Sequence, residues 1–126
     1  FALTELWNGT NWTEVNDLNT ARDFLAGAGT TTAGLAFGGE TPTITAITET
    51  WNGTNWTEVA DLNTARSALA GAGVSNTAAL AFGGSAPPYT GATESWNGTS
   101  WTETADLATA RSRLAGAGAS NTRAVI

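Results

Sequence analysis

Short stretches in which apolar and polar residues alternate recur along the chain, separated by clusters of Gly, Asn, Ser, Pro and Asp. A period of two is typical of β-strands, and the residues between the stretches are those that form turns. The stretches are rich in Thr, Trp, Val and Gly, which favours strands over helices. In the central part of the chain the pattern predicts four strands, over Leu69–Val74, Thr77–Phe82, Ala92–Trp96 and Trp101–Ala105.

One segment allows a competing interpretation. The stretch "DLNTARSALAGAG", Asp61–Gly73, begins with capping residues and contains several alanines, as a short helix does. Its glycines interrupt such a helix quickly. We therefore predict a loop that leads into a strand, with the short helix as the alternative.

The whole pattern repeats three times. Trp7, Trp51 and Trp96 lie 44 and 45 residues apart, and Phe37-Gly38-Gly39 recurs as Phe82-Gly83-Gly84. A period near 45 residues occurs in helical arrays and in propellers whose blades have four strands. Because the repeats are poor in helix-forming residues, we expect four-stranded blades and an all-β fold.

The most regular part of the repeat is "WNGTNWTEV", Trp51–Val59. With Gly53-Thr54 at the centre of a type II′ turn, Asn52 faces Asn55 and Trp51 faces Trp56 across a hairpin. A four-residue loop gives the same tryptophan pair. We predict three such structural pairs, which are Trp7 with Trp12, Trp51 with Trp56, and Trp96 with Trp101.

The repeat resembles a Kelch unit over essentially the whole chain. Kelch units carry a basic residue before the inner strand, a double Gly after the second strand, an aromatic on the third and a Trp on the fourth. Those places are taken here by Arg66, Gly83-Gly84, Trp96 and Trp101, and one repeat earlier by Arg22, Gly38-Gly39, Trp51 and Trp56. The first aromatic is Trp where Kelch units usually have Tyr, and the hairpin is shorter. The resemblance implies a Kelch-like β-propeller and no particular ligand.

Counting strands in this frame divides the single domain, residues 1–126, into four parts. Residues 1–18 give a half blade with the outer strands, 19–61 and 62–106 give two full blades, and 107–126 give a half blade with the inner strands. Propellers have 4–8 blades, so one chain cannot close a ring. We expect a homo-oligomer that shares blades, with six blades from a dimer favoured over nine from a trimer or an open filament. The alternative is a piece of a longer repeat array.

Composition narrows the chemistry. The chain lacks Lys, His and Cys, which removes the usual nucleophile–base pairs, zinc sites and P-loops, so we expect no enzyme, metal or cofactor. A net charge of −6 with scattered arginines disfavours nucleic acid and anionic membranes. A glycosidase built on strand carboxylates remains a minor alternative. Those carboxylates recur in every repeat, namely Glu5, Glu14, Glu49, Glu58, Glu94 and Glu103.

The candidate ligand-binding residues lie on loops. Three arginines, each five residues after an aspartate, open the inner strands, and we expect them to form ion pairs or a basic ring around the axis. Tyr89 and Glu40 lie in the two loops that differ most between repeats. The arginines are Arg22, Arg66 and Arg111, and the aspartates are Asp17, Asp61 and Asp106.

The expected function is that of a non-enzymatic interaction or structural module that assembles with itself. The alternative is a lectin-like propeller with a shallow glycan site on each blade, built on the tryptophans. A protein ligand is equally compatible with the loops. The Thr- and Asn-rich composition favours an extracellular or virion surface, and the hairpins carry acceptor patterns for N-glycosylation at Asn8, Asn11, Asn52, Asn55 and Asn97.

Overall fold

The computed structural model describes residues 1–126 and contains strands, turns and loops but no helix. The predicted central strands are confirmed to within one residue at each end, and Asp61–Gly73 forms no helix. The strands are β1 (Thr4–Trp7), β2 (Trp12–Val15), β3 (Ala26–Thr30), β4 (Ala33–Phe37), β5 (Thr48–Trp51), β6 (Trp56–Val59), β7 (Ala70–Ser75), β8 (Ala78–Phe82), β9 (Thr93–Trp96), β10 (Trp101–Thr104), β11 (Ala117–Ser120) and β12 (Arg123–Val125).

The strands form two complete sheets and two incomplete ones, all antiparallel. Strands β3 to β6 make a four-stranded sheet in chain order (the first sheet), and β7 to β10 make another (the second sheet). Strands β1 and β2 form a two-stranded sheet (the N-terminal pair), and β11 and β12 form another (the C-terminal pair). The N-terminal pair matches the third and fourth strands of a complete sheet, and the C-terminal pair matches the first and second.

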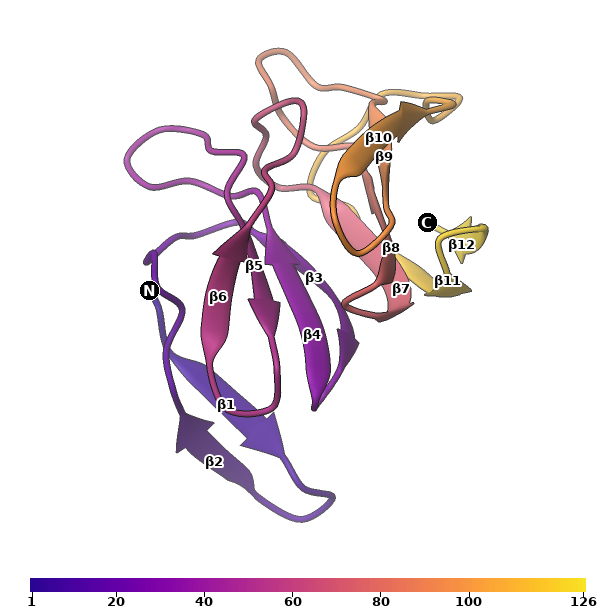
Figure 1. Cartoon of the computed structure of the whole chain (residues 1–126). Helices are drawn as coiled ribbons and strands as arrows, with labels where there is room; N and C mark the ends of the chain where they lie inside the picture. Colours follow the sequence, from indigo (N-terminus) through magenta and orange to yellow (C-terminus); the bar gives the residue numbers. More distant parts are fainter.

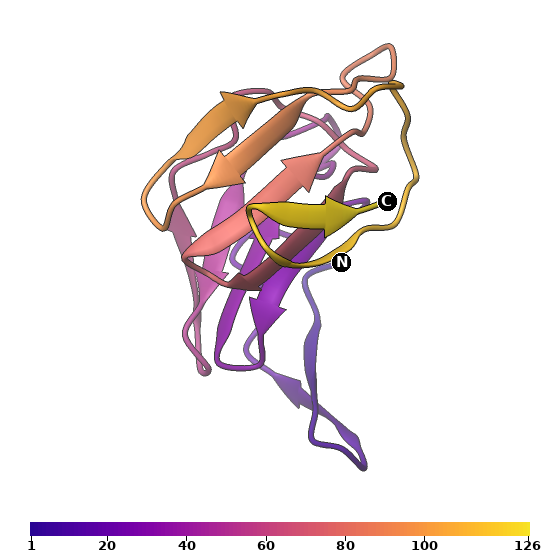
Figure 2. The ribbon, with the colours of Figure 1, turned by 90° about the vertical axis from the view of Figure 1, so that its right-hand side faces the viewer.

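The sheets stand side by side in a row (Figure 1). Their first strands are neighbours, since β3 lies against β7 and β7 lies against β11. Figure 2 shows the second sheet and the C-terminal pair after a quarter turn, with the N-terminal pair at the far end of the row. This arrangement is compatible with the blades of a β-propeller-like fold. No helix of the chain is long and apolar enough to span a membrane.

The main core fills the space between the first and second sheets. The Phe37 ring meets the Trp101 ring edge to face, with 5.0 Å between centroids. The sheets approach closely because small residues face the aromatics, and a Cβ on Gly71 would lie 2.6 Å from the Phe37 ring. The buried members of this core are Leu35, Phe37, Leu62, Leu69, Ala79, Ala81, Trp96 and Trp101.

The "WNGT" hairpins owe their shape to Asn52 and its equivalents. The Asn52 Oδ1 atom accepts hydrogen bonds from the amides of Thr54 and Asn55 at 2.9 and 2.8 Å. Gly53 has a φ of +95°, which residues with a Cβ rarely adopt. The Asn52 amide donates to the Asn55 carbonyl, which places Asn52 opposite Asn55 as predicted. Trp51 therefore lies opposite Trp56.

The double glycine docks each sheet onto the loop that leads to the next. The Gly39 amide donates to the Arg66 carbonyl at 3.0 Å, and a Cβ on Gly38 would lie 2.7 Å from the same oxygen. Gly38 also has a φ of +66°. Gly84 repeats the hydrogen bond with the Arg111 carbonyl at 2.9 Å. The backbones of Arg66 and Arg111 are thus held in the same way.

Candidate interaction interface

The six tryptophans form three cross-strand pairs. The ring centroids are 5.5 Å apart for Trp7 and Trp12, 5.3 Å for the Trp51 pair and 5.2 Å for the Trp96 pair, all in tilted geometry. Such pairs contribute about 0.5–1.5 kcal/mol beyond area burial. Only the pair of Trp7 and Trp12 has both rings substantially exposed.

Burial of the second tryptophan follows the completeness of the preceding sheet. Trp12 has no preceding sheet and is 64% exposed. Trp56 contacts Thr4 of the N-terminal pair and is half-buried. Trp101 contacts Phe37 and Thr48 of the complete first sheet and is 5% exposed. The exposure of Trp12 therefore reflects a missing neighbour and not a different local structure.

A hydrogen bond repeats at two of the contacts between successive sheets. The Trp56 indole donates to the Thr4 hydroxyl at 3.0 Å, and the Trp101 indole donates to the Thr48 hydroxyl at 3.1 Å. In the second sheet the equivalent of Thr48 is Thr93 on β9. Thr93 lies opposite Phe82, as Thr48 lies opposite Phe37. Within one chain no indole reaches Thr93, and the Trp12 indole finds no hydroxyl.

Two arginines are buried in ion pairs inside the complete sheets. Arg22 Nη2 lies 3.3 Å from Glu49 Oε1, Arg66 Nη2 lies 2.9 Å from Glu94 Oε2, and all four side chains have 0% exposure. The guanidinium groups also donate to strand carbonyls, while both Nε atoms have no partner. A buried pair of this kind needs both members, because either charge alone is strongly unfavourable.

The partners of these arginines correct the sequence prediction. The aspartates five residues earlier are exposed and do not pair with them. The arginines pair instead with the glutamates on β5 and β9. The loop that carries each arginine packs on the third strand of its sheet, which brings together two residues that are 27 or 28 positions apart in sequence. Burial lowers the pKa of Arg22 and of Arg66, and the neighbouring glutamates oppose that shift.

Two asparagines that were not predicted from the sequence complete the ion-pair sites. Asn63 donates its backbone and side-chain amides to Glu94 Oε1 at 2.6 and 2.9 Å, and its side chain also donates to the Trp101 carbonyl. Asn19 makes the same three bonds to Glu49 and Trp56. The third repeat has Ala108 at this position. The recurrence of Asn three residues before Arg was the available signal.

Arg111 differs from the other two arginines in this structure. It is exposed, and its only side-chain hydrogen bond is a 3.5 Å contact to the Thr109 carbonyl. Arg22 and Arg66 form the ion pairs that were one of the two predicted roles, and burial keeps both side chains away from the surface. Glu5, which matches Glu49 and Glu94 in the repeat, has no arginine partner.

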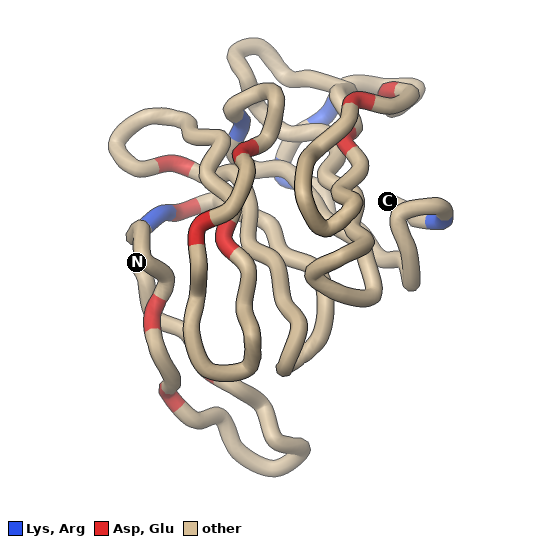
Figure 3. Tube along the Cα trace, viewed as in Figure 1, with Lys and Arg blue, Asp and Glu red and all other residues tan.

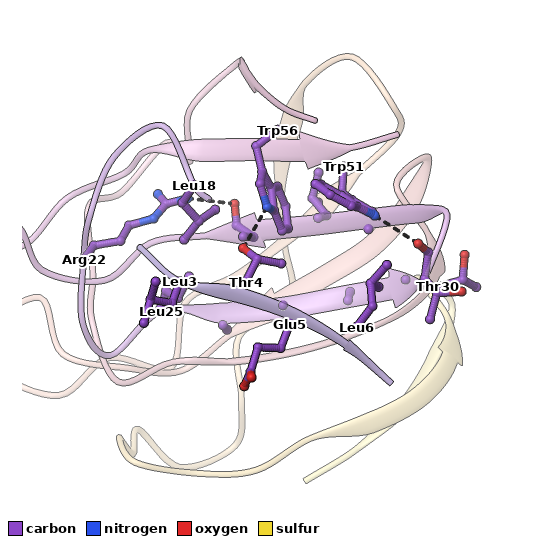
Figure 4. A pocket seen from close by; sticks show the side chains of 18 of the residues that line it. Leu3, Thr4, Glu5, Leu6, Leu18, Arg22, Leu25, Thr30, Trp51 and Trp56 are labelled. Atoms are coloured by element: carbon purple, nitrogen blue, oxygen red, sulfur yellow. Dashed lines mark hydrogen bonds between the residues drawn. The ribbon is translucent and has the colours of Figure 1, made fainter. Parts of the chain in front are cut away.

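A groove of about 730 Å³ runs between the N-terminal pair and the first sheet. One wall is formed by Leu3 and by Thr4 and Leu6 of β1, and the floor is the face of β3 and β4. Figure 4 shows Thr4 directed at Trp56, while Glu5 points to the opposite side of β1. In a complete sheet the first and second strands occupy the position of this groove. The groove is therefore suited to a pair of strands equivalent to β3 and β4.

A second groove, of about 310 Å³, lies at the other end of the row. It is lined by Leu80, Phe82 and Thr93 of the second sheet and by Ala124 and Ile126 of the C-terminal pair. A complete sheet has its outer two strands here. The two grooves are therefore complementary, since each lacks the strands that the opposite end of the chain presents.

Tyr89 and Glu40 lie apart from these grooves. Glu40 accepts a hydrogen bond from the Ser67 hydroxyl at 2.7 Å, and its backbone pairs with Asp23. Tyr89 is exposed beside a hollow of about 100 Å³ that Arg113 also lines. The structure thus brings Tyr89 and Glu40 together on the loop side of the row, without Arg22, Arg66 or Arg111.

The positions of the charged residues are spread along the chain trace (Figure 3). No group of three acidic side chains is placed to hold a metal ion. Protein-family models and curated proteins both give no match to this chain. Its class rests on the structure, which is all-β with four-stranded antiparallel sheets in a propeller-like row.

Proposed function

We propose that this chain is a non-catalytic, Kelch-like propeller module whose function is to assemble with itself by sharing blades. The C-terminal pair of one copy and the N-terminal pair of a second copy (the partner) join into one four-stranded sheet, and we call this junction the seam. The observation that carries the proposal is the complementarity of the two grooves.

The register of the complete sheets specifies the hydrogen-bonded ladder across the seam. In the second sheet Ala79, Leu80 and Ala81 pair with Trp96, Ser95 and Glu94. One repeat later the equivalent ladder joins Ala124 to the partner's Trp7, Val125 to the partner's Leu6 and Ile126 to the partner's Glu5. Both edges are unpaired in one chain, and unpaired edges are the usual sites of strand addition.

The seam also supplies the missing neighbour of Trp12. The partner's Trp12 packs on Phe82 and donates to the Thr93 hydroxyl, as Trp101 does with Phe37 and Thr48. Two seams formed by two copies give six sheets, a number that suits a closed propeller. Burying two exposed tryptophans at each seam is a large apolar gain.

The test is the solution mass of the 126-residue chain, measured by size exclusion with light scattering. We expect twice the mass of one chain. Trp12→Ala should shift the chain to the monomer while the complete sheets stay folded in urea unfolding, because Trp12 packs on no other sheet within its own chain. Trp101→Ala, as the matched variant, should lower the free energy of unfolding by about 3–5 kcal/mol. A monomeric wild-type chain at high micromolar concentration would refute the proposal.

A lectin-like function has narrower support. Three of the tryptophans, Trp51, Trp96 and Trp101, are buried, so repeated glycan sites on all blades lack their platforms. The exposed pair of Trp7 and Trp12 still resembles an aromatic platform for a sugar. A glycan array distinguishes the two functions, because binding that is lost in Trp12→Ala while the mass remains that of a dimer supports the lectin.

A further inference from the structure

We infer that each seam contains a buried ion pair between Arg111 of one copy and the partner's Glu5. This inference rests on the proposed assembly and goes beyond it by naming the charged contact that selects the correct partner edge. The pair is the third member of the series formed within one chain by Arg22 with Glu49 and by Arg66 with Glu94.

Both halves of the pair are already in position in the single chain. The Arg111 carbonyl accepts from the Gly84 amide at 2.9 Å, as the Arg66 carbonyl accepts from Gly39 at 3.0 Å. Glu5 lies opposite Glu14 in the N-terminal pair, as Glu94 lies opposite Glu103 in the second sheet. Each half therefore has part of the backbone frame of an intact site and lacks the opposite charge.

Joining the strands in the register of the complete sheets brings these two charges together. Ile126 lies opposite the partner's Glu5 in that register, and the intact arginine sites pair with the glutamate opposite the matching residue, Ala81. Closing the seam removes both groups from water, and a buried charge without its partner costs several kcal/mol. The pair therefore acts mainly through specificity, since an edge without the opposite charge is rejected.

Alternative occupants of the open edges fit less well. A generic extended peptide supplies backbone hydrogen bonds to β1 and leaves Glu5 beneath it without a cation. An apolar ligand in either groove leaves Arg111 in water. A second copy of this chain supplies the strand, the Trp12 indole and the opposite charge in one register. A second copy is therefore the occupant that we infer for these edges.

A charge exchange tests the inference. Glu5→Arg and Arg111→Glu each place like charges at both seams of a homodimer, so each variant alone should dimerise at least about a hundredfold more weakly than the wild type. Mixed in equal amounts, the two variants form a heterodimer in which one seam has the native pair and the other has the reversed pair. Native mass spectrometry should then show a one-to-one complex.

Controls separate this inference from the proposed assembly. Thr13→Arg adds a cation to the neighbouring strand on the face opposite Glu5, at a position exposed in complete sheets, and should change the dimer affinity by less than about threefold. The milder variants Glu5→Gln and Arg111→Gln give a double-mutant cycle if a charge reversal prevents folding. A wild-type monomer would refute the assembly itself. A wild-type dimer that both reversals leave intact, or that mixing does not restore, would refute the ion pair alone.

Discussion

At the residue scale, the fold depends on charged groups that it hides. Arg66 reaches through the second sheet to three carbonyls and to Glu94, and Asn63 closes the site from the loop. Burial lowers the pKa of Arg66 while Glu94 opposes the shift, so the carboxylate keeps an otherwise costly cation in place. The pair fastens the loop before β7 to the third strand of the same sheet.

Removing the carboxylate should be costly. We expect Glu94→Ala to lower the free energy of unfolding by about 3–5 kcal/mol, because it leaves the Arg66 charge buried and uncompensated. Glu103→Ala, directly opposite on the exposed side of β10, should change it by less than about 0.5 kcal/mol. Urea unfolding at one fixed chain concentration measures both. Equal losses would show that the pair has no special role.

This scale also shows what the sequence does not reveal. The spacing of five residues predicted the tryptophan pairs because cross-strand partners in a hairpin are set locally. The sequence did not identify the arginine partners, because Asp61 is close to Arg66 in sequence whereas Glu94 becomes its neighbour only after the sheet has formed. Whether a charged side chain is buried depends on which elements pack against it in the fold, and no local sequence pattern identifies those elements.

At the element scale, glycines set the geometry of turns and of contacts between sheets. Gly53 permits the backbone reversal at the hairpin tip, where a Cβ would have 3.6 Å to its nearest neighbour. Gly38 has a similar positive φ but lies against the Arg66 carbonyl and the Leu69 side chain. Substituting each of the two glycines therefore distinguishes the cost of backbone strain from the cost of a steric clash.

An alanine comparison makes this separation measurable. Gly53→Ala should lower the free energy of unfolding by about 1 kcal/mol, which is the cost of a left-handed residue with a Cβ. Gly38→Ala should cost at least about 1 kcal/mol more, because its Cβ displaces the loop of the next sheet. Thermal or urea unfolding of both variants gives the difference. Equal losses would mean that the contact at Gly38 relaxes freely.

Strand positions were the most predictable feature at this scale. The alternation of small and apolar residues and the Asn-Gly turns located the four central strands, because both signals act within one hairpin. Ala92 and Ala105 were predicted as strand residues and lie just outside β9 and β10. Both alanines lie in the adjoining loops, and the Ala92 carbonyl accepts a hydrogen bond from the Arg66 guanidinium.

At the scale of the whole molecule, the proposed seam is expected to be weaker than the contacts within the chain. Asn19 and Asn63 each bind the glutamate of their sheet and a tryptophan carbonyl, and Ala108 cannot. The seam therefore lacks two side-chain hydrogen bonds that the intact sheets possess. A junction of this kind is expected to be reversible while the sheets themselves stay folded.

Restoring the missing amide should tighten the assembly. Ala108→Asn adds bonds to the partner's Glu5 and to the carbonyl of the partner's Trp12, and we expect the dimer dissociation constant to fall at least about tenfold. Ala108→Gln, whose amide is displaced by one methylene, should not reproduce the gain. Dilution experiments by analytical ultracentrifugation measure both constants. An unchanged constant for Ala108→Asn would contradict the proposed register of the seam.

One backbone hydrogen bond between successive sheets recurs in the same sense along the row. The Ala68 amide donates to the Phe24 carbonyl and the Arg113 amide donates to the Ala68 carbonyl, both at 2.8 Å. The molecule consequently has a head and a tail, like the monomer of a directional polymer. Growth stops only where the rotation between sheets brings a tail back to its own head. A variant with a damaged head and an intact tail would then act as a chain terminator.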